Sequence, residues 1–195
     1  ANYYGVDVIA STSNTIGGTA SGEGNLISGN RAAGIRMNNS GYNLVEGNFI
    51  GTDVTGTLSL TSGAWGISIS GGAGSNIIGG TTVGARNIIS GNYTATIGIR
   101  IQNINGYAPS VNTGNVVEGN YIGTDVTGTK ALGGNVGVQI STNYNVVGGT
   151  VPGAGNLISG NKIFGLNIQN VAAGTLVEGN YIGTDATGTV ALGNG

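Results

Sequence analysis

The chain has 195 residues, of which 41 are glycine and 25 are asparagine, whereas only 7% are charged. Because it contains neither cysteine nor histidine, a disulfide framework, a zinc finger, a thiol nucleophile and a histidine base are excluded. The net charge of −2 and the lack of a long apolar run argue against nucleic acid as a partner and against membrane insertion. This composition is typical of an ordered repeat protein.

Three short elements recur in a fixed order along the chain. The first is a Gly-aliphatic-x-aliphatic tetrapeptide, which begins at Gly5, Gly34, Gly66, Gly98, Gly137 and Gly165. The second is Asn-x-aliphatic-x-Gly, which begins at Asn14, Asn43, Asn76, Asn115 and Asn145, with Thr175 at the sixth place. The third begins at Asn25, Asn48, Asn87, Asn120, Asn156 and Asn180. Residues alternate with a period of two inside each element, which predicts short β-strands.

Insertions of two kinds alternate between successive cycles. The first, third and fifth cycles have six extra residues between the second and third elements, as at 19–24. The second, fourth and sixth cycles have about eight extra residues after the third element, and these include Thr-Gly-Thr at 55–57, 127–129 and 187–189. The chain is therefore three copies of a two-cycle unit. We expect one domain over 1–195, with rungs at 5–33, 34–65, 66–97, 98–136, 137–164 and 165–195.

Strands this short cannot form a stable sheet in isolation. They can do so if each cycle closes one coil, because each strand then pairs in parallel with its equivalent about 4.8 Å away. One predicted inner stack contains Val6, Ile35, Ile67, Ile99, Val138 and Leu166, and another contains Ile27, Ile50, Ile89, Ile122, Ile158 and Ile182. We therefore predict an all-β fold, a parallel β-helix (solenoid) of six rungs. General crossover chirality predicts a right-handed coil.

These rungs resemble the right-handed parallel β-helix repeat, which occurs in pectate-lyase-like folds and in many large bacterial surface proteins. The resemblance covers residues 5–195. The phrases Gly-Asn-Tyr-Ile-Gly-Thr-Asp and Asn-Leu-Ile-Ser-Gly-Asn are similar to those of long repetitive secreted proteins. The resemblance implies an extracellular or cell-surface location. It does not choose a function, because the same coil carries enzymes, adhesins and structural proteins.

Asparagine is predicted to form structural ladders along two corners of the coil. An asparagine at the same corner of every rung can bond its amide to the next rung, as in stacked-strand arrays. The series at the start of the third element is the first predicted ladder, with Asn25, Asn48, Asn87, Asn120, Asn156 and Asn180. The second predicted ladder alternates amide and acid, with Asn30, Asp53, Asn92, Asp125, Asn161 and Asp185.

Acidic residues recur at equivalent places in alternate rungs, where they could serve catalysis, calcium binding or structure. They are Glu46, Glu118 and Glu178, together with Asp53, Asp125 and Asp185. A catalytic site is normally a single constellation, whereas these acids recur three times. We therefore favour aspartates that cap their own corner turns, and we expect no enzyme, no catalytic residues and no cofactor. Calcium bound by the insertion loops is the alternative.

Two other functions are alternatives to a structural one. A carbohydrate-binding or carbohydrate-acting module would need exposed aromatic rings, for which Trp65, Tyr93 and Tyr107 are the candidates. Ice binding would need a flat threonine array, but Thr-Gly-Thr falls in predicted loops. Two apolar stripes are also predicted on the outside of the second and third elements. We expect the insertions to cover part of these stripes, and lateral contacts between copies or a surface polysaccharide to cover the rest.

Both ends of the predicted coil lack a polar cap, and both are cut at a rung boundary. The last rung is of the kind that precedes the first kind, so head-to-tail stacking of copies would continue the alternation. The sequence therefore predicts a structural extracellular solenoid that stacks end to end into a filament, with the chain itself as the partner. A rigid surface stalk within a longer adhesin is the rival form of this hypothesis.

Overall fold

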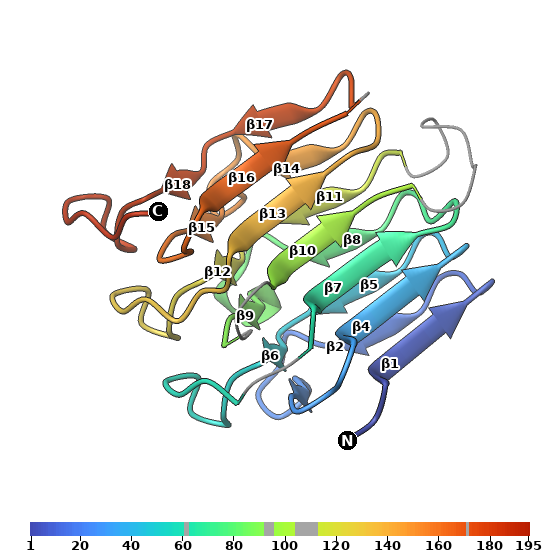
Figure 1. The fold of residues 1–195 in the computed structure, drawn as a ribbon, viewed down its shortest axis with the longest axis horizontal. Helices are drawn as coiled ribbons and strands as arrows, with labels where there is room; N and C mark the ends of the chain where they lie inside the picture. The colour runs from blue at the N-terminus through green and yellow to red at the C-terminus, as the bar shows by residue number, and fades with distance from the viewer. Residues whose placement is uncertain (61–62, 92–95, 104–112, 171) are drawn as a thin grey trace.

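Figure 1 shows the computed structural model of the chain, which describes residues 1–60, 63–91, 96–103, 113–170 and 172–195. These residues form β-strands in three sheets, each with six strands, and one 3₁₀ turn at Val83–Ala85. All neighbouring strands are parallel, and each strand pairs with its equivalent one rung away. The predicted all-β parallel solenoid is confirmed.

The sheets correspond to the three repeat elements. The first contains β1 (Tyr4–Ile9), β4 (Ala33–Asn38), β7 (Trp65–Ser70), β10 (Ile97–Ile101), β13 (Val136–Ile140) and β16 (Phe164–Ile168). The second contains β2 (Thr15–Gly17), β5 (Leu44–Glu46), β8 (Ile77–Gly79), β11 (Val116–Glu118), β14 (Val146–Gly148) and β17 (Leu176–Glu178). The third contains β3 (Leu26–Ile27), β6 (Phe49–Ile50), β9 (Ile88–Ile89), β12 (Tyr121–Ile122), β15 (Leu157–Ile158) and β18 (Tyr181–Ile182).

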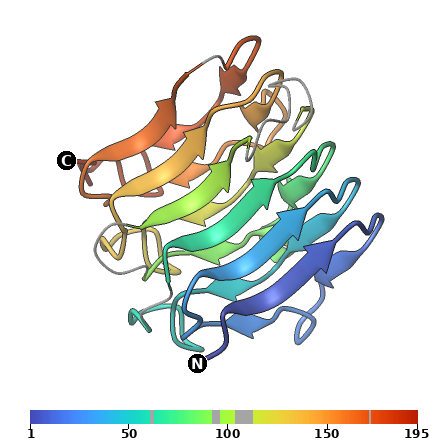
Figure 2. The ribbon, with the colours of Figure 1, turned by 45° about the vertical axis from the view of Figure 1, so that its right-hand side comes forward.

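The rungs stack in chain order from the first to the last. In Figures 1 and 2 the colour changes from blue to red along the stack, and the two termini lie at its opposite ends. The first sheet forms one broad face, with β1 at one edge and β16 at the other. As a result, β1, β2 and β3 border one end of the coil, and β16, β17 and β18 border the other.

The core consists of aliphatic side chains stacked in register. The two predicted stacks are present, and Ile67, Ile99 and Ile122 are among their fully buried members. Two further stacks were not predicted. One follows Val45, Ile78, Val117 and Val147, and the other follows Met37, Ile69, Ile101 and Ile140. Burying such a side chain contributes about 1.5–3 kcal/mol, so these stacks supply the main apolar stabilisation of the coil.

The insertions of the even rungs form loops that leave the coil on one side, next to β6, β12 and β18 (Figure 1). Isolated antiparallel bridges close them between Thr52 and Ser59, Thr124 and Ala131, and Thr184 and Ala191. Successive loops bond to one another, since the amide of Val126 donates to the Gly56 carbonyl at 2.9 Å and that of Ala186 to the Gly128 carbonyl at 3.0 Å. The loops therefore form a column with a period of two rungs.

Glycine is required where β11 ends. Gly119 has a φ of +68°, which favours glycine, and it directly precedes a ladder asparagine. A Cβ at Gly119 would lie 1.9 Å from the carbonyl oxygen of Gly80, so there is no room for a side chain. This corner can therefore approach the neighbouring rung closely only with glycine.

Candidate functional site

The first predicted asparagine series forms a continuous hydrogen-bonded column. Both the backbone amide and Nδ2 of Asn48 donate to Oδ1 of Asn87, each at 3.0 Å. Asn87 donates in the same way to Asn120, at 3.3 and 2.9 Å. The same pairing joins Asn25 to Asn48, Asn120 to Asn156 and Asn156 to Asn180. Each rung thus donates to the next rung, and the column has a fixed direction.

Each internal asparagine also bonds to the rung before it. The Nδ2 group of Asn87 donates to the Val45 carbonyl at 2.8 Å, and that of Asn120 donates to the Ile78 carbonyl at 2.8 Å. One side chain therefore links three successive rungs. Asn87 and Asn120 are completely buried, and in this environment a lost partner would leave an amide group unsatisfied.

A second asparagine column runs along the start of the second element, and sequence reasoning missed it. Nδ2 donates to the Oδ1 of the next rung from Asn14 to Asn43, Asn43 to Asn76, Asn76 to Asn115 and Asn115 to Asn145, at 2.8–3.0 Å. The column ends at Asn145, because Thr175 has no amide group to accept the next bond. The recurrence of asparagine at this place in five rungs was the signal that could have predicted it.

The aspartates of the second predicted series bond within their own loops. Asp125 Oδ1 accepts from the backbone amides of Thr129 and Lys130 at 3.0 and 3.1 Å, and its carboxylate also accepts from the Thr127 hydroxyl. Asp53 and Asp185 make the equivalent contacts. This arrangement matches the capping role favoured from the sequence and differs from the predicted ladder.

These hydrogen bonds stabilise the charged form of the loop carboxylates. The Thr55 hydroxyl, followed by the Leu58 amide, lowers the pKa of Asp53 to about 2. The Thr187 hydroxyl likewise lowers the pKa of Asp185 below its ordinary value. Each Thr-Gly-Thr pair is also engaged internally, since the hydroxyl oxygens of Thr55 and Thr57 lie 2.6 Å apart. The threonine hydroxyls that an ice-binding surface would use thus form hydrogen bonds within their own turns.

The asparagines of that second series behave differently from its aspartates. The amide and Nδ2 of Asn161 donate to Oδ1 of Asn194 at 3.1 and 2.9 Å, so Asn161 does not pair with Asp185. Asn30 donates to the Ser28 carbonyl at 3.3 Å, and Asn92 lies outside the described residues. The loop of the last rung begins just before Asp185. The residue that stacks on Asn161 is therefore Asn194, which follows the loop. The prediction of one alternating ladder is therefore wrong at Asp185.

The three recurring glutamates end alternate strands of the second sheet. Glu46, Glu118 and Glu178 end β5, β11 and β17, and burial raises the pKa of Glu118. Within the described ranges, no group of three or more His, Cys, Asp or Glu residues lies close enough to hold a metal ion. Those ranges also contain no helix with the length and apolar character to cross a membrane.

Three arginine side chains of the described residues lie over aromatic rings, and one of these contacts joins Arg36 to Tyr4. The Arg100 guanidinium carbon lies 4.8 Å from the ring centre of Trp65, and that of Arg86 lies 4.0 Å from the ring centre of Tyr121. Each of these rings is therefore occupied on one face by a cation–π contact. Trp65 is thus only partly available for sugar stacking, whereas the candidates Tyr93 and Tyr107 lie outside the described residues.

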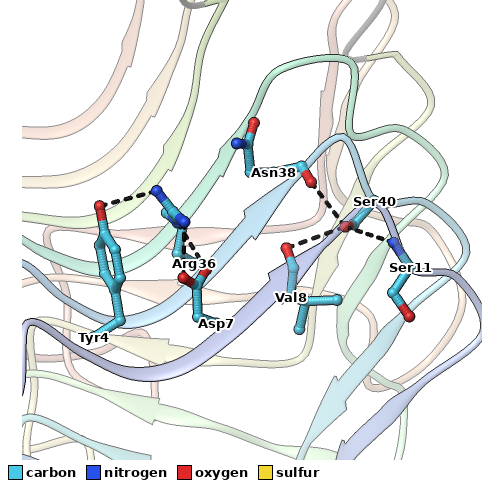
Figure 3. Close-up of polar contacts among 7 residues, drawn as sticks. All are labelled: Tyr4, Asp7, Val8, Ser11, Arg36, Asn38 and Ser40. Atoms are coloured by element: carbon cyan, nitrogen blue, oxygen red, sulfur yellow. Dashed lines mark hydrogen bonds and ion pairs between the residues drawn. The ribbon is translucent and has the colours of Figure 1, made fainter.

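Polar contacts also join the first two rungs along β1 and β4 and just beyond their ends (Figure 3). Arg36 donates to both carboxylate oxygens of Asp7 at 2.7 Å and to the hydroxyl of Tyr4 at 3.1 Å. Near the far end of the same strands, the Ser40 hydroxyl oxygen lies 3.1 Å from the Val8 carbonyl and accepts from the Ser11 amide at 3.3 Å. These contacts supplement the backbone pairing of β1 and β4.

The two outer apolar stripes are covered to different extents. On the third sheet, Ile88 and Leu157 are buried, and Gly128 of an even-rung loop lies against Leu157 and Tyr121. On the second sheet, Ile77 remains 40% exposed. The insertions therefore cover much of the stripe on the third sheet and leave part of the stripe on the second sheet open to solvent. Partial cover by the insertions agrees with the sequence, and cover of the remainder by a partner stays a prediction.

The two ends of the coil have different surfaces. In the last rung the core residues Val177 and Ile182 are 37% and 45% exposed, whereas their equivalents in the interior are fully buried. In the first rung Ile16 and Ile27 are only 9% and 6% exposed, and they line a hollow of about 630 Å³ at that end. One end thus presents apolar side chains, and the other presents a concavity.

The polar groups of the two asparagine columns join successive rungs, and the loop carboxylates accept hydrogen bonds from their own turns. Comparisons of the chain with protein-family models, with curated proteins and with solved structures gave no match.

Proposed function

We propose that the chain is a structural β-solenoid of the cell exterior that stacks end to end, as a filament or as a rigid surface stalk. The exposed apolar core of the last rung is the observation that carries this proposal. Val177 and Ile182 belong to stacks whose members in the interior rungs are buried. Covering the two residues with a further rung would therefore remove apolar surface from water.

The internal bonding of the coil supports a mechanical role. Hydrogen bonds of the Asn25–Asn180 column join residues 23–39 positions apart, and three parallel sheets join the same rungs. Bending the coil would strain both the sheets and the buried amides. A stiff rod of this kind transmits force along its axis, which is what a fibre or stalk requires.

The partner in this proposal is another copy of the chain, joined head to tail. The location outside the cell rests on the likeness of the repeat phrases to those of long secreted proteins. The function needs no cofactor, since the stability of the junction would come from apolar burial and hydrogen bonds.

A matched pair of substitutions tests the proposal. We expect Ile182→Lys to abolish concentration-dependent assembly in analytical ultracentrifugation, because it places a charge in the end surface. Ile77→Lys is the control, since Ile77 has nearly the same exposure, at 40% against 45%, but lies on the side of the coil. Assembly that resists Ile182→Lys and is lost with Ile77→Lys would indicate lateral association and contradict the proposal.

A further inference from the structure

We infer that the last rung binds the first rung of a second copy in one orientation and one register, with Asn180 donating to Oδ1 of Asn25. This inference rests on the proposed stacking function and adds the atoms that would form the junction. Three separate hydrogen-bonding patterns inside the coil, each with a direction, point to the same register.

The asparagine column supplies the first pattern. In every internal step, the backbone amide and Nδ2 of one rung donate to the Oδ1 of the next rung, as from Asn156 to Asn180. Asn180 is held in the internal geometry, because its Nδ2 donates to the Val147 carbonyl at 2.8 Å. Its next acceptor would come from a seventh rung. The Oδ1 of Asn25 in a second copy occupies that place if the column continues.

Contacts between even rungs and odd-rung insertions supply the second pattern. The Gly47 amide donates to the Ala85 carbonyl at 3.1 Å, and the Gly119 amide donates to the Ala154 carbonyl at 2.9 Å. Gly179 occupies the third equivalent place, and its amide has no corresponding acceptor in the described part of the chain. Ala85 and Ala154 each lie two residues before a ladder asparagine, as Glu23 lies two before Asn25. The Glu23 carbonyl of a second copy would therefore complete this series.

The column of even-rung loops supplies the third pattern, with a period of two rungs. The Gly56 carbonyl accepts from the Val126 amide, and the Gly128 carbonyl accepts from the Ala186 amide. In the last loop, the equivalent carbonyl is that of Gly188. Its donor in a stacked copy is the Val54 amide, because Val54 occupies the place of Val126 and Ala186. The Val54 amide lies in the second rung of the stacked copy, which is two rungs after the rung of Gly188. A neighbour provides a donor at this place only if its loops alternate with the same two-rung period.

The shapes of the ends agree with this register. Ile182 is exposed on the last rung, and the hollow at the first rung is lined by its equivalent, Ile27, as well as by Asn25. A second copy matches the end surface in apolar character, in hydrogen-bond direction and in the alternation of its loops. We therefore assign the C-terminal end surface to the N-terminal end of another copy.

Disulfide trapping tests the register directly, since the chain contains no native cysteine. Thr15 and Leu176 hold the equivalent outer position in the end strands β2 and β17. In the inferred stack their Cα atoms are about 4.8 Å apart, and disulfides accept Cα separations of about 4.4–6.8 Å. The double variant Thr15→Cys/Leu176→Cys should form a ladder of covalent multimers on mild oxidation.

Thr15→Cys/Tyr181→Cys is the matched control, because Tyr181 is also exposed but belongs to the third sheet. We expect at least about ten-fold more multimer from the matched pair, because stacking holds its thiols at a millimolar effective concentration. Equal cross-linking of the two pairs would overturn the register. Multimers of the unsubstituted chain without matched cross-linking would keep the proposed stacking and overturn this junction. A strictly monomeric chain would overturn both and leave the ends to a different segment or partner.

Discussion

The asparagine columns and the aspartate loops use the same hydrogen-bonding chemistry over very different distances along the chain. Asn87 accepts from a residue 39 positions earlier, and it is completely buried. Asp125 is also buried, at 1% exposed, but it accepts from amides only four and five positions later, within its own loop. An amide or carboxylate oxygen satisfies backbone donors in both cases. Only the asparagine column joins one rung to another, so it supports the whole coil, whereas each aspartate supports one loop.

The difference follows from where an insertion enters the rung. The insertion of the odd rungs ends just before the third element, so Asn87 directly precedes β9 as Asn120 directly precedes β12, and the two amides meet. The even-rung loop leaves the coil at Thr124, and Asp125 moves out with it. Identical spacing from a strand therefore does not guarantee stacking when the chain leaves the coil in between.

The strongest way to break this comparison is to remove an internal ladder amide. Asn120→Ala deletes one acceptor for Asn87 and one donor to Asn156, and it leaves buried groups without partners. Because each unsatisfied buried group costs about 1–3 kcal/mol, we expect the free energy of unfolding to fall by about 3 kcal/mol. Urea unfolding followed by circular dichroism measures this change. A loss below about 1 kcal/mol would show that the column is not a main stabilising element.

The corresponding change in a loop should have a smaller and local effect. Asp125→Ala removes the caps on Thr129 and Lys130, and we expect a loss of about 1–2 kcal/mol, in the range of a lost helix N-cap. Asp125→Asn, which keeps an acceptor, is the control and should lose less. Hydrogen exchange should accelerate in residues 124–131 and remain slow in β12 and β15. Faster exchange throughout the coil would contradict the local role of the aspartate.

Much of this organisation could be predicted from the sequence because equivalent residues recur at constant places. The two aliphatic stacks and the Asn25–Asn180 column were found in this way. The pairing of Asn161 with Asn194 could not be found, because the partner follows an insertion and has no counterpart at Gly134. The contact of Arg86 with Tyr121 also escaped prediction, since it joins different elements of adjacent rungs.

A substitution of Asn180, at the end of the Asn25–Asn180 column, distinguishes the effect of the column on folding from its effect on assembly. Asn180→Ala removes the acceptor for Asn156 and the donor to the Val147 and Glu178 carbonyls, but the rung is partly exposed and water can replace these partners. We therefore expect a loss of only about 1 kcal/mol in the free energy of unfolding. The same variant should assemble poorly, because the inferred junction uses Asn180 as its donor. Light scattering against concentration measures assembly. Normal assembly by this variant would separate stacking from the asparagine column.

The smallest expected effect is the response to acid. The folded-state pKa of Asp53 is about 2, below its ordinary value of 3.8, so its loop bonds contribute stability above about pH 4 and lose that contribution as the pH falls towards 2. The lowered pKa of Asp185 acts in the same direction. Carboxyl carbon NMR of Asp53 should show a midpoint near pH 2. A midpoint near 4 would mean that Thr55 and Leu58 do not hold the carboxylate.

End-to-end stacking itself is tested most directly by cryo-electron microscopy of the unsubstituted chain at neutral pH. Six rungs per chain at about 4.8 Å each predict fibres whose subunits rise by about 29 Å along the axis, with the strand spacing unbroken at each junction. Isolated short rods, or fibres in which coils lie side by side, would contradict the account.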